Sequence, residues 1–227
     1  MYEYVTKAEY SPVKKQLESI LRRVQKIMET DYELPFTYEL IGSGKRHLIT
    51  RIKGGNRGYD FDYNLIIPHP GQGYKYKAKV IKGDFIEAFK RALKGTCYSF
   101  PKDSTSAITI KVIDKANKKI EFQCDFAVIY FDDNDGCEGY RYLRNDKQSG
   151  KYSFAFRALC KGKINRKLDE ILEYTNGWNW VRDEYLKLKN INEGNKNKHS
   201  FSLYYEAIHN VYNQIKPSKP RFQIISL

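Results

Sequence analysis

The sequence has few of the residues that build metal–sulfur sites or disulfide frameworks. Only four of its 227 residues are cysteine and four are histidine. No two cysteines have CxxC spacing and no histidine lies at ligand spacing from a cysteine, which argues against a zinc site. The histidines form no pair with metal-ligand spacing, so we expect them in loops or on the surface. Cys124 and Cys160 lie among apolar residues and are expected to be buried thiols.

Long hydrophobic runs are also missing. No apolar stretch approaches the roughly 20 residues of a membrane-spanning helix. The first ten residues are polar and lack the pattern of a signal peptide. We therefore expect a cytoplasmic protein with no membrane partner. Nothing in the sequence indicates the number of subunits.

Acidic residues are outnumbered by basic ones. The 40 Lys and Arg residues against 27 Asp and Glu give a net charge of +13. This balance favours a polyanionic partner, such as nucleoside triphosphates, nucleic acid or an anionic surface, although a lysine-rich composition alone would produce the same charge. The 19 Tyr and 12 Phe residues can pack half-buried or stack on a nucleobase.

Hydrophobic periodicity predicts an α+β fold with two parts. Ser11 and Pro12 have the pattern of an N-cap and a first-turn proline before an amphipathic helix. Asp84 and Glu87 have the pattern of a capping box at the start of a second helix. We predict a mixed sheet flanked by helices in residues 1–160, followed by a helical C-terminal lobe in residues 161–227.

Shorter elements follow from the same patterns. Alternating apolar residues predict strands over 36–41, 59–67, 108–112, 119–130, 140–144 and 152–156. Helical spacing predicts helices over 168–172, 178–188 and 203–215. Residues 132–136 are expected to form an acidic loop, and residues 222–225 have the pattern of a short strand.

Three aspartates stand out on the predicted strands. Asp60 and Asp62 are two residues apart, so both carboxylates project from the same face of their strand. Taken alone, they would be two solvated surface acids. Asp125 lies on a later strand and faces away from its apolar side. If the two strands are neighbours, the three carboxylates converge, and divalent cations would relieve their repulsion. Three carboxylates can hold two Mg²⁺ ions about 3.5–4 Å apart.

A glycine-rich turn precedes these acids. Gly42, Ser43 and Gly44 directly follow the strand predicted at 36–41. Glycines allow backbone N–H groups to approach phosphate oxygens closely, and a serine hydroxyl adds another donor. Lys45 follows, but the other residues of a Walker P-loop are missing.

The order of Gly-Ser turn, Asp-x-Asp strand and later aspartate resembles the nucleotidyltransferase superfamily, typified by DNA polymerase beta. The turn is most similar to that of oligoadenylate synthetases and bacterial cyclic-oligonucleotide synthases. Those proteins also carry a threonine and a glycine before Asp-x-Asp, matched here by Thr50 and Gly54. The resemblance covers roughly residues 11–130.

The resemblance implies a metal-dependent transfer reaction in a catalytic core formed by residues 1–160. Gly42 and Ser43 would hold the phosphates of ATP or another nucleoside triphosphate. Asp60, Asp62 and Asp125 would be the catalytic residues and the ligands of two Mg²⁺ or Mn²⁺ ions. An acceptor hydroxyl would attack the α-phosphorus, and pyrophosphate would leave.

The resemblance also extends to the helical part. Members of the synthetase group place a lysine on one helix and a serine at the start of the next against the triphosphate. Lys187 or Lys189 matches the lysine, and Ser200 or Ser202 matches the serine. Solvated lysines and an ordinary helix start would give the same pattern. Three basic residues near the Gly-Ser turn could also assist: Lys45, Arg46 and Arg51.

Several functions fit these residues. Within the enzyme hypothesis, the acceptor could be a second nucleotide, an RNA 3′ end, a protein hydroxyl or a small molecule. The alternative is a catalytically inactive nucleotidyltransferase-like module that binds nucleic acid through its basic surface, although the presence of all three aspartates argues against it. A third hypothesis is a soluble scaffold whose acids are incidental.

Overall fold

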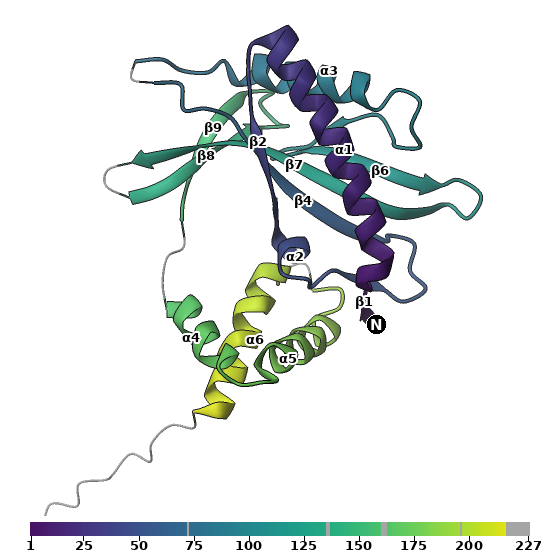
Figure 1. Ribbon diagram of the computed structural model, residues 1–227, viewed down its shortest axis with the longest axis vertical. Coiled ribbons are helices and arrows are strands. Elements are labelled where there is room, and N and C mark those ends of the chain that lie inside the picture. Colours follow the sequence, from purple (N-terminus) through teal and green to yellow (C-terminus); the bar gives the residue numbers. More distant parts are fainter. Residues whose placement is uncertain (72, 135–136, 160–162, 196, 217–227) are drawn as a thin grey trace, which may run out of the picture. The chain divides into compact units, whose positions relative to one another are not determined.

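The computed structural model describes residues 1–71, 73–134, 137–159, 163–195 and 197–216 (Figure 1). The chain divides into two compact units. The larger unit, Glu3–Leu159, contains the main sheet, and the smaller unit joins Met1–Tyr2 to the C-terminal helices. The predicted class, a mixed sheet flanked by helices together with a helical C-terminal part, is confirmed.

Within the described residues, the main sheet has seven strands, in the order β2-β4-β7-β6-β5, with β8 pairing with β7 and β9 with β8. Strands β4 and β7 are parallel, and the other pairs are antiparallel. The strands are β2 (Thr37–Ile41), β4 (Tyr59–Ile66), β5 (Lys102–Asp103), β6 (Ile108–Asp114), β7 (Lys119–Asn134), β8 (Cys137–Asn145) and β9 (Tyr152–Ala158). Two short strands that the sequence did not predict, β1 (Tyr2–Tyr4) and β3 (Thr50–Ile52), form a separate sheet.

The core lies between one face of the main sheet and helices α1 and α3. Alternate residues of β4 and β7, including Phe61, Tyr63, Cys124 and Phe126, are buried against these helices. Cys124 is therefore buried as predicted, whereas Cys160 lies outside the described residues. Asp60, Asp62, Gln123 and Asp125, which alternate with these residues, are less buried and lie on the opposite face, as the strand alternation requires.

Helix α1 (Lys7–Tyr32) begins earlier than predicted. Thr6 is its N-cap, and Thr6 and Glu9 form a capping box. This box satisfies two backbone donors at the helix start. The helix continues through Pro12, where one backbone hydrogen bond is lost. The prediction that Ser11 begins the helix was therefore wrong, while its apolar face is buried as expected.

Helix α3 (Ala78–Ala92) also begins earlier than predicted, since its N-cap position is Lys77. Asp84 and Glu87 lie inside the helix, so the capping box predicted there is wrong. The apolar stripe begins upstream with Ala78 and Ile81, and burial of these residues extends the helix by almost two turns.

The predicted acidic loop at 132–136 is largely strand. Strand β7 runs to Asn134 and pairs with β8, and residues 135–136 lie outside the described part of the chain. Asp132 accepts a hydrogen bond from Arg141 across this pair. Cross-strand pairing with a basic residue thus allows an acidic segment to remain in the sheet.

The smaller unit contains α4 (Lys163–Leu172), α5 (Gly177–Ile191) and α6 (Ser200–Ile215), as predicted. The buried residues include Ile171, Val181, Leu203 and Val211. The strand predicted at 222–225 lies outside the described residues. Among the described residues, none of the helices combines the length and the hydrophobicity needed to cross a bilayer.

Candidate active site

The parallel pairing of β4 with β7 brings the three aspartates onto one face of the main sheet, here called the acidic face. Asp62 is the direct register partner of Asp125, and Asp60 is the partner of Gln123. Their buried neighbours in both strands point to the opposite side, toward α1 and α3. The sequence analysis predicted this convergence on the condition that the two strands are neighbours. The structure confirms that condition, because β4 pairs with β7.

The three carboxylates interact unfavourably with one another. Burial, together with the negative charges of Asp125 and Asp60, raises the pKa of Asp62 to about 6. The pKa is raised because the ionised carboxylate of Asp62 lacks a compensating positive charge. A bound cation would provide that charge.

The donor set fits a hard divalent cation, since Mg²⁺ prefers carboxylate oxygens. Within the described residues, however, no three His, Cys, Asp or Glu side chains form a ready-made metal site. Asp62 and Asp125 are nevertheless direct register partners on adjacent strands, and Asp60 lies two residues before Asp62 on the same face. The residues present therefore fit the ion by chemistry and by strand register.

The Gly-Ser turn lies beside these acids. Strand β2 ends at Ile41, the register partner of Asp62, and the chain then enters α2 (Gly42–Lys45), a single helical turn. Gly42 has φ +62°, and a Cβ atom placed there would lie 2.8 Å from Asp62 Oδ2. Glycine is required because both the backbone conformation and the close approach of the carboxylate disfavour a side chain.

The basic residues near the turn have different partners. Lys45 pairs with Glu39. Arg51 bridges Glu3 and Glu9, each at 2.7 Å.

Arg46 donates from Nη1 to the carbonyl oxygen of Gly42 at 3.0 Å. Arg46, one of the three basic residues that the sequence suggested as assistants, thus contacts the Gly-Ser turn itself.

In the smaller unit, Lys187 contacts Glu184 at 3.2 Å. Lys189 instead donates to the Oγ of Ser200, also at 3.2 Å, and its ammonium lies 4.2 Å from the centroid of the Tyr2 ring. The lysine that meets the serine at the start of α6 is therefore Lys189. The assignment of Lys187 and Ser200 to nucleotide binding stays a prediction from the sequence.

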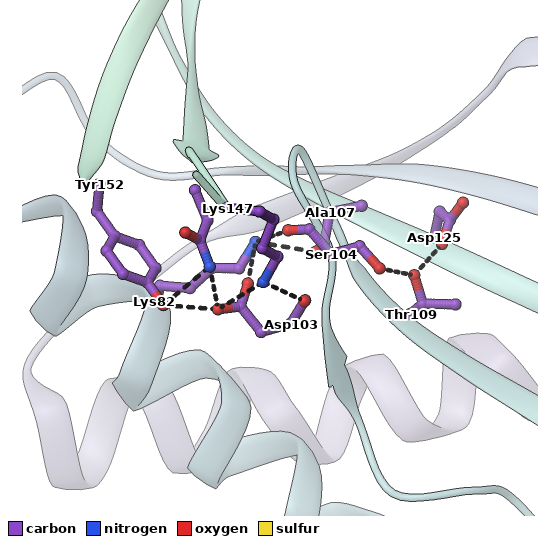
Figure 2. A network of polar contacts seen from close by, with 9 residues as sticks. Lys82, Asp103, Ser104, Ala107, Thr109, Asp125, Lys147 and Tyr152 are labelled. Carbon is purple, nitrogen blue, oxygen red and sulfur yellow. Dashed lines mark hydrogen bonds and ion pairs between the residues drawn. The ribbon is translucent and has the colours of Figure 1, made fainter. Parts of the chain in front are cut away.

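The sequence reasoning missed a polar network behind Asp125. Thr109, on β6, is the register partner of Asp125 and donates its hydroxyl hydrogen to Asp125 Oδ1. Figure 2 shows that further contacts link this pair to a buried lysine, Lys82. The sequence contains a signal for both residues, namely a polar side chain within an apolar pattern. Thr109 alternates with the apolar Ile108 and Ile110, and Lys82 lies within the apolar stripe of α3.

Comparison with known proteins identifies the fold. No protein-family model matches the sequence, and no protein of curated function matches it significantly. Solved structures do match. The apo form of DncV from Vibrio cholerae has a TM-score of 0.65 at 13% identity, covering 92% of this chain and 68% of that chain.

Two further matches carry nucleotides. Vibrio cholerae DncV cyclic AMP-GMP synthase in complex with the linear intermediate 5′-pppA(3′,5′)pG has a TM-score of 0.61 at 10% identity, covering 92% of this chain and 68% of that one. Elizabethkingia meningoseptica CdnE cyclic dinucleotide synthase with GTP and Apcpp has a TM-score of 0.53 at 14% identity, covering 91% and 71%. The chain thus has the fold of DncV and CdnE.

The raised pKa of Asp62 predicts a pH-dependent effect on stability in chelator-treated buffer. Because the folded-state pKa lies above the unfolded value, ionised Asp62 destabilises the fold. This penalty is small near pH 4, grows as the pH rises, and is complete above about pH 6. We expect Asp62→Asn to increase the free energy of unfolding by about 2 kcal/mol at pH 7.5, and by little at pH 4.

Urea denaturation at both pH values measures this difference. Asp183→Asn, at an exposed position of α5, is the control because it changes the net charge equally. A stabilisation by Asp62→Asn that is the same at pH 4 and pH 7.5 would contradict the raised pKa.

Proposed function

We propose that the chain is a metal-dependent nucleotidyltransferase that moves a nucleoside monophosphate from a nucleoside triphosphate to an acceptor hydroxyl. The observation that carries the proposal is the alignment of Asp62 with Asp125 across β4 and β7, with the Gly-Ser turn directly beside Asp62. The fold shared with DncV and CdnE supports it.

Each residue of the acidic face has a role in this proposal. Asp60, Asp62 and Asp125 would hold two Mg²⁺ or Mn²⁺ ions, which neutralise the triphosphate and lower the pKa of the attacking hydroxyl. Backbone N–H groups of the Gly-Ser turn and the Ser43 hydroxyl would bind the β- and γ-phosphates. Asp125 would also help to take the proton of the acceptor hydroxyl. The acceptor oxygen forms a bond to the α-phosphorus, the bond to the bridging oxygen breaks, and pyrophosphate leaves with the electron pair.

The catalytic role belongs in this proposal to the larger unit, which contains all three aspartates and the Gly-Ser turn. The sequence boundary proposed at residues 160 and 161 assigns the same elements to a catalytic core. In the smaller unit, Lys187 or Lys189 and Ser200 remain candidates for contacts with the triphosphate.

Among the possible acceptors, we favour a second nucleotide, which would give a linear or cyclic dinucleotide. The matched DncV structure holds a linear intermediate, and the matched CdnE structure holds GTP and a triphosphate analogue. The net charge of +13 suits two triphosphates as well. An RNA end, a protein hydroxyl or a small molecule would appear as a different labelled product.

The test is transfer of label from each α-labelled nucleoside triphosphate, alone and in pairs, with Mg²⁺ or Mn²⁺. We expect a labelled product that migrates as a dinucleotide, and loss of transfer by at least about 100-fold in the Asp60→Asn, Asp62→Asn double variant, because these acids would stabilise the transition state electrostatically. Asp183→Asn is the control and should transfer at the wild-type rate.

Label found on RNA or on the protein would redirect the acceptor assignment. If the chain binds the triphosphate only weakly and without dependence on metal, while it binds RNA in a salt-dependent way, the inactive binding module becomes the better description. Equal transfer by the wild-type chain and the double variant would refute the role of the acidic face.

A glycine substitution separates backbone strain from the chemistry of the site. Gly42→Ala places a methyl group against Asp62 Oδ2, so the carboxylate must turn away. Gly95→Ala, after α3, also has positive φ but meets no atom within 4 Å. We expect both variants to lose about 1–2 kcal/mol of stability from the left-handed conformation.

Only Gly42→Ala should weaken metal-dependent binding of a non-hydrolysable triphosphate, which isothermal titration calorimetry measures. If the two variants bind equally well, the contact between the turn and Asp62 has no part in binding the ligand.

A further inference from the structure

A buried lysine anchors the loop between β5 and β6. Lys82 of α3 is only 2% exposed. Its ammonium donates to the carbonyl oxygen of Ala107 at 2.9 Å and to that of Ser104 at 3.4 Å, and it lies 3.5 Å from Asp103 Oδ1. Burying an ammonium group is costly, and an apolar residue of similar volume commonly stabilises such a position more. This cost indicates that the lysine serves something other than packing.

Asp103 connects the lysine to the edge of the sheet. Its Oδ2 accepts hydrogen bonds from Tyr152 Oη at 2.7 Å and from Asn145 Nδ2 at 2.6 Å. Asn145, which is 4% exposed, also donates to Tyr152 Oη at 2.9 Å. Lys147 binds the Asp103 carbonyl oxygen at 2.8 Å. Residues of α3, β8 and β9 thus hold the start of this loop in place.

The loop carries the hydroxyl group that reaches the acidic face. The Oγ of Ser104 lies 2.8 Å from Thr109 Oγ1, which donates to Asp125 Oδ1 (Figure 2). A threonine hydroxyl has one hydrogen to donate. Because Thr109 uses it for Asp125, Ser104 must be the donor to Thr109. The hydrogen bonds therefore run in one direction, from Ser104 through Thr109 to one oxygen of Asp125.

We propose that the Ser104–Thr109 hydroxyl pair, anchored by Lys82, is the positioning device for Asp125 in the acidic face. This inference rests on the proposed function, in which Asp125 binds a divalent cation. The hydrogen bond fixes the rotation of the carboxylate and occupies Oδ1, which leaves Oδ2 to bind a cation. Partners of this kind hold metal ligands in a productive orientation and increase their affinity for the ion.

The charge of Lys82 supports the same arrangement. Burial lowers the pKa of Lys82 to about 8, while attraction to Asp103 and, more weakly, to Asp125 opposes this decrease. The ammonium group is therefore mostly protonated at pH 7. The positive charge of Lys82 helps to lower the pKa of Asp103, which holds the start of the loop.

The test measures Mn²⁺ binding by the full chain, with Mn²⁺ alone as the probe and electron paramagnetic resonance as the readout. Thr109→Val keeps the shape of the side chain and removes the hydroxyl, whereas Thr109→Ser keeps the hydroxyl. We expect Thr109→Val to weaken Mn²⁺ binding by about 10-fold or more, and Thr109→Ser to remain within about threefold of wild type. Thr37→Val, at an exposed position at the start of β2, is the matched control and should bind as wild type does.

Two further variants extend the test along the network. Ser104→Ala should weaken Mn²⁺ binding less than Thr109→Val, because it removes only the donor that orients Thr109. In label transfer, Thr109→Val should lower kcat at saturating Mg²⁺ and leave the KM for the triphosphate within about threefold. Lys82→Met should act in the same direction, and thermal melting separates its effect on folding from its effect on binding.

Equal Mn²⁺ affinity of the wild type and Thr109→Val would overturn the proposal. An equal loss in Thr109→Ser and Thr109→Val would overturn it too, because packing and not the hydroxyl would then be responsible. A wild-type chain that binds no Mn²⁺ has the same consequence. If the chain binds Mn²⁺ with the expected difference between the two variants but transfers no label, the proposed function fails and the positioning role stands.

Discussion

Parallel pairing of β4 with β7 sets Asp62 directly across from Asp125, and the other features of the acidic face depend on this register. A shift by one residue would turn every side chain of one strand to the opposite face. The carboxylates would then point into the core, and the aromatic residues would point to solvent. The burial of Phe61 and Tyr63 on β4 and of Cys124 and Phe126 on β7 therefore specifies the position of the aspartates. In this sense the hydrophobic core determines where the acids lie.

The core behind the acids is tightly packed and aromatic. The rings of Tyr63 and Phe126 are stacked at 6.0 Å, and Phe89 of α3 lies 4.6 Å from Phe126. Such packing limits backbone movement at the site. The three aspartates are therefore held in position before a cation binds. Burial, followed by the nearby aspartates, raises the pKa of Cys124. The thiol is therefore neutral and unreactive, although it is adjacent to Asp125 in the sequence.

Much of this arrangement could be predicted from the sequence, because it follows from local periodicity. Strand alternation predicted that Asp60 and Asp62 lie on the same face of their strand and that Asp125 points away from the core. The Gly-Ser turn that precedes them was also recognisable. The starts of the two helices were harder to predict. The residues around Ser11 and Asp84 match capping patterns, but α1 begins at the capping box of Thr6 and α3 begins where its apolar stripe begins, at Ala78.

Thr109 and Lys82 could be noticed in the sequence, but the contacts of the network behind Asp125 could not be predicted from it. Lys82 meets Ala107, and Asp103 meets Tyr152 across 49 positions, so these contacts depend on tertiary structure and not on local pattern. The side-chain contacts of the two lysines in α5 were likewise not predictable: Lys189 donates to Ser200, whereas Lys187 contacts Glu184.

The three-way contact among Asp103, Asn145 and Tyr152 also has an evolutionary consequence. Each of these residues bonds to both of the others, and they come from β5, β8 and β9. A partly satisfied buried network is less stable than either a complete one or an apolar replacement. Single substitutions at these positions would thus be disfavoured as intermediates. Descendants of this chain should keep the three residues as a set or lose them together, and the β8–β9 hairpin is not free to diverge as an isolated appendage of the sheet.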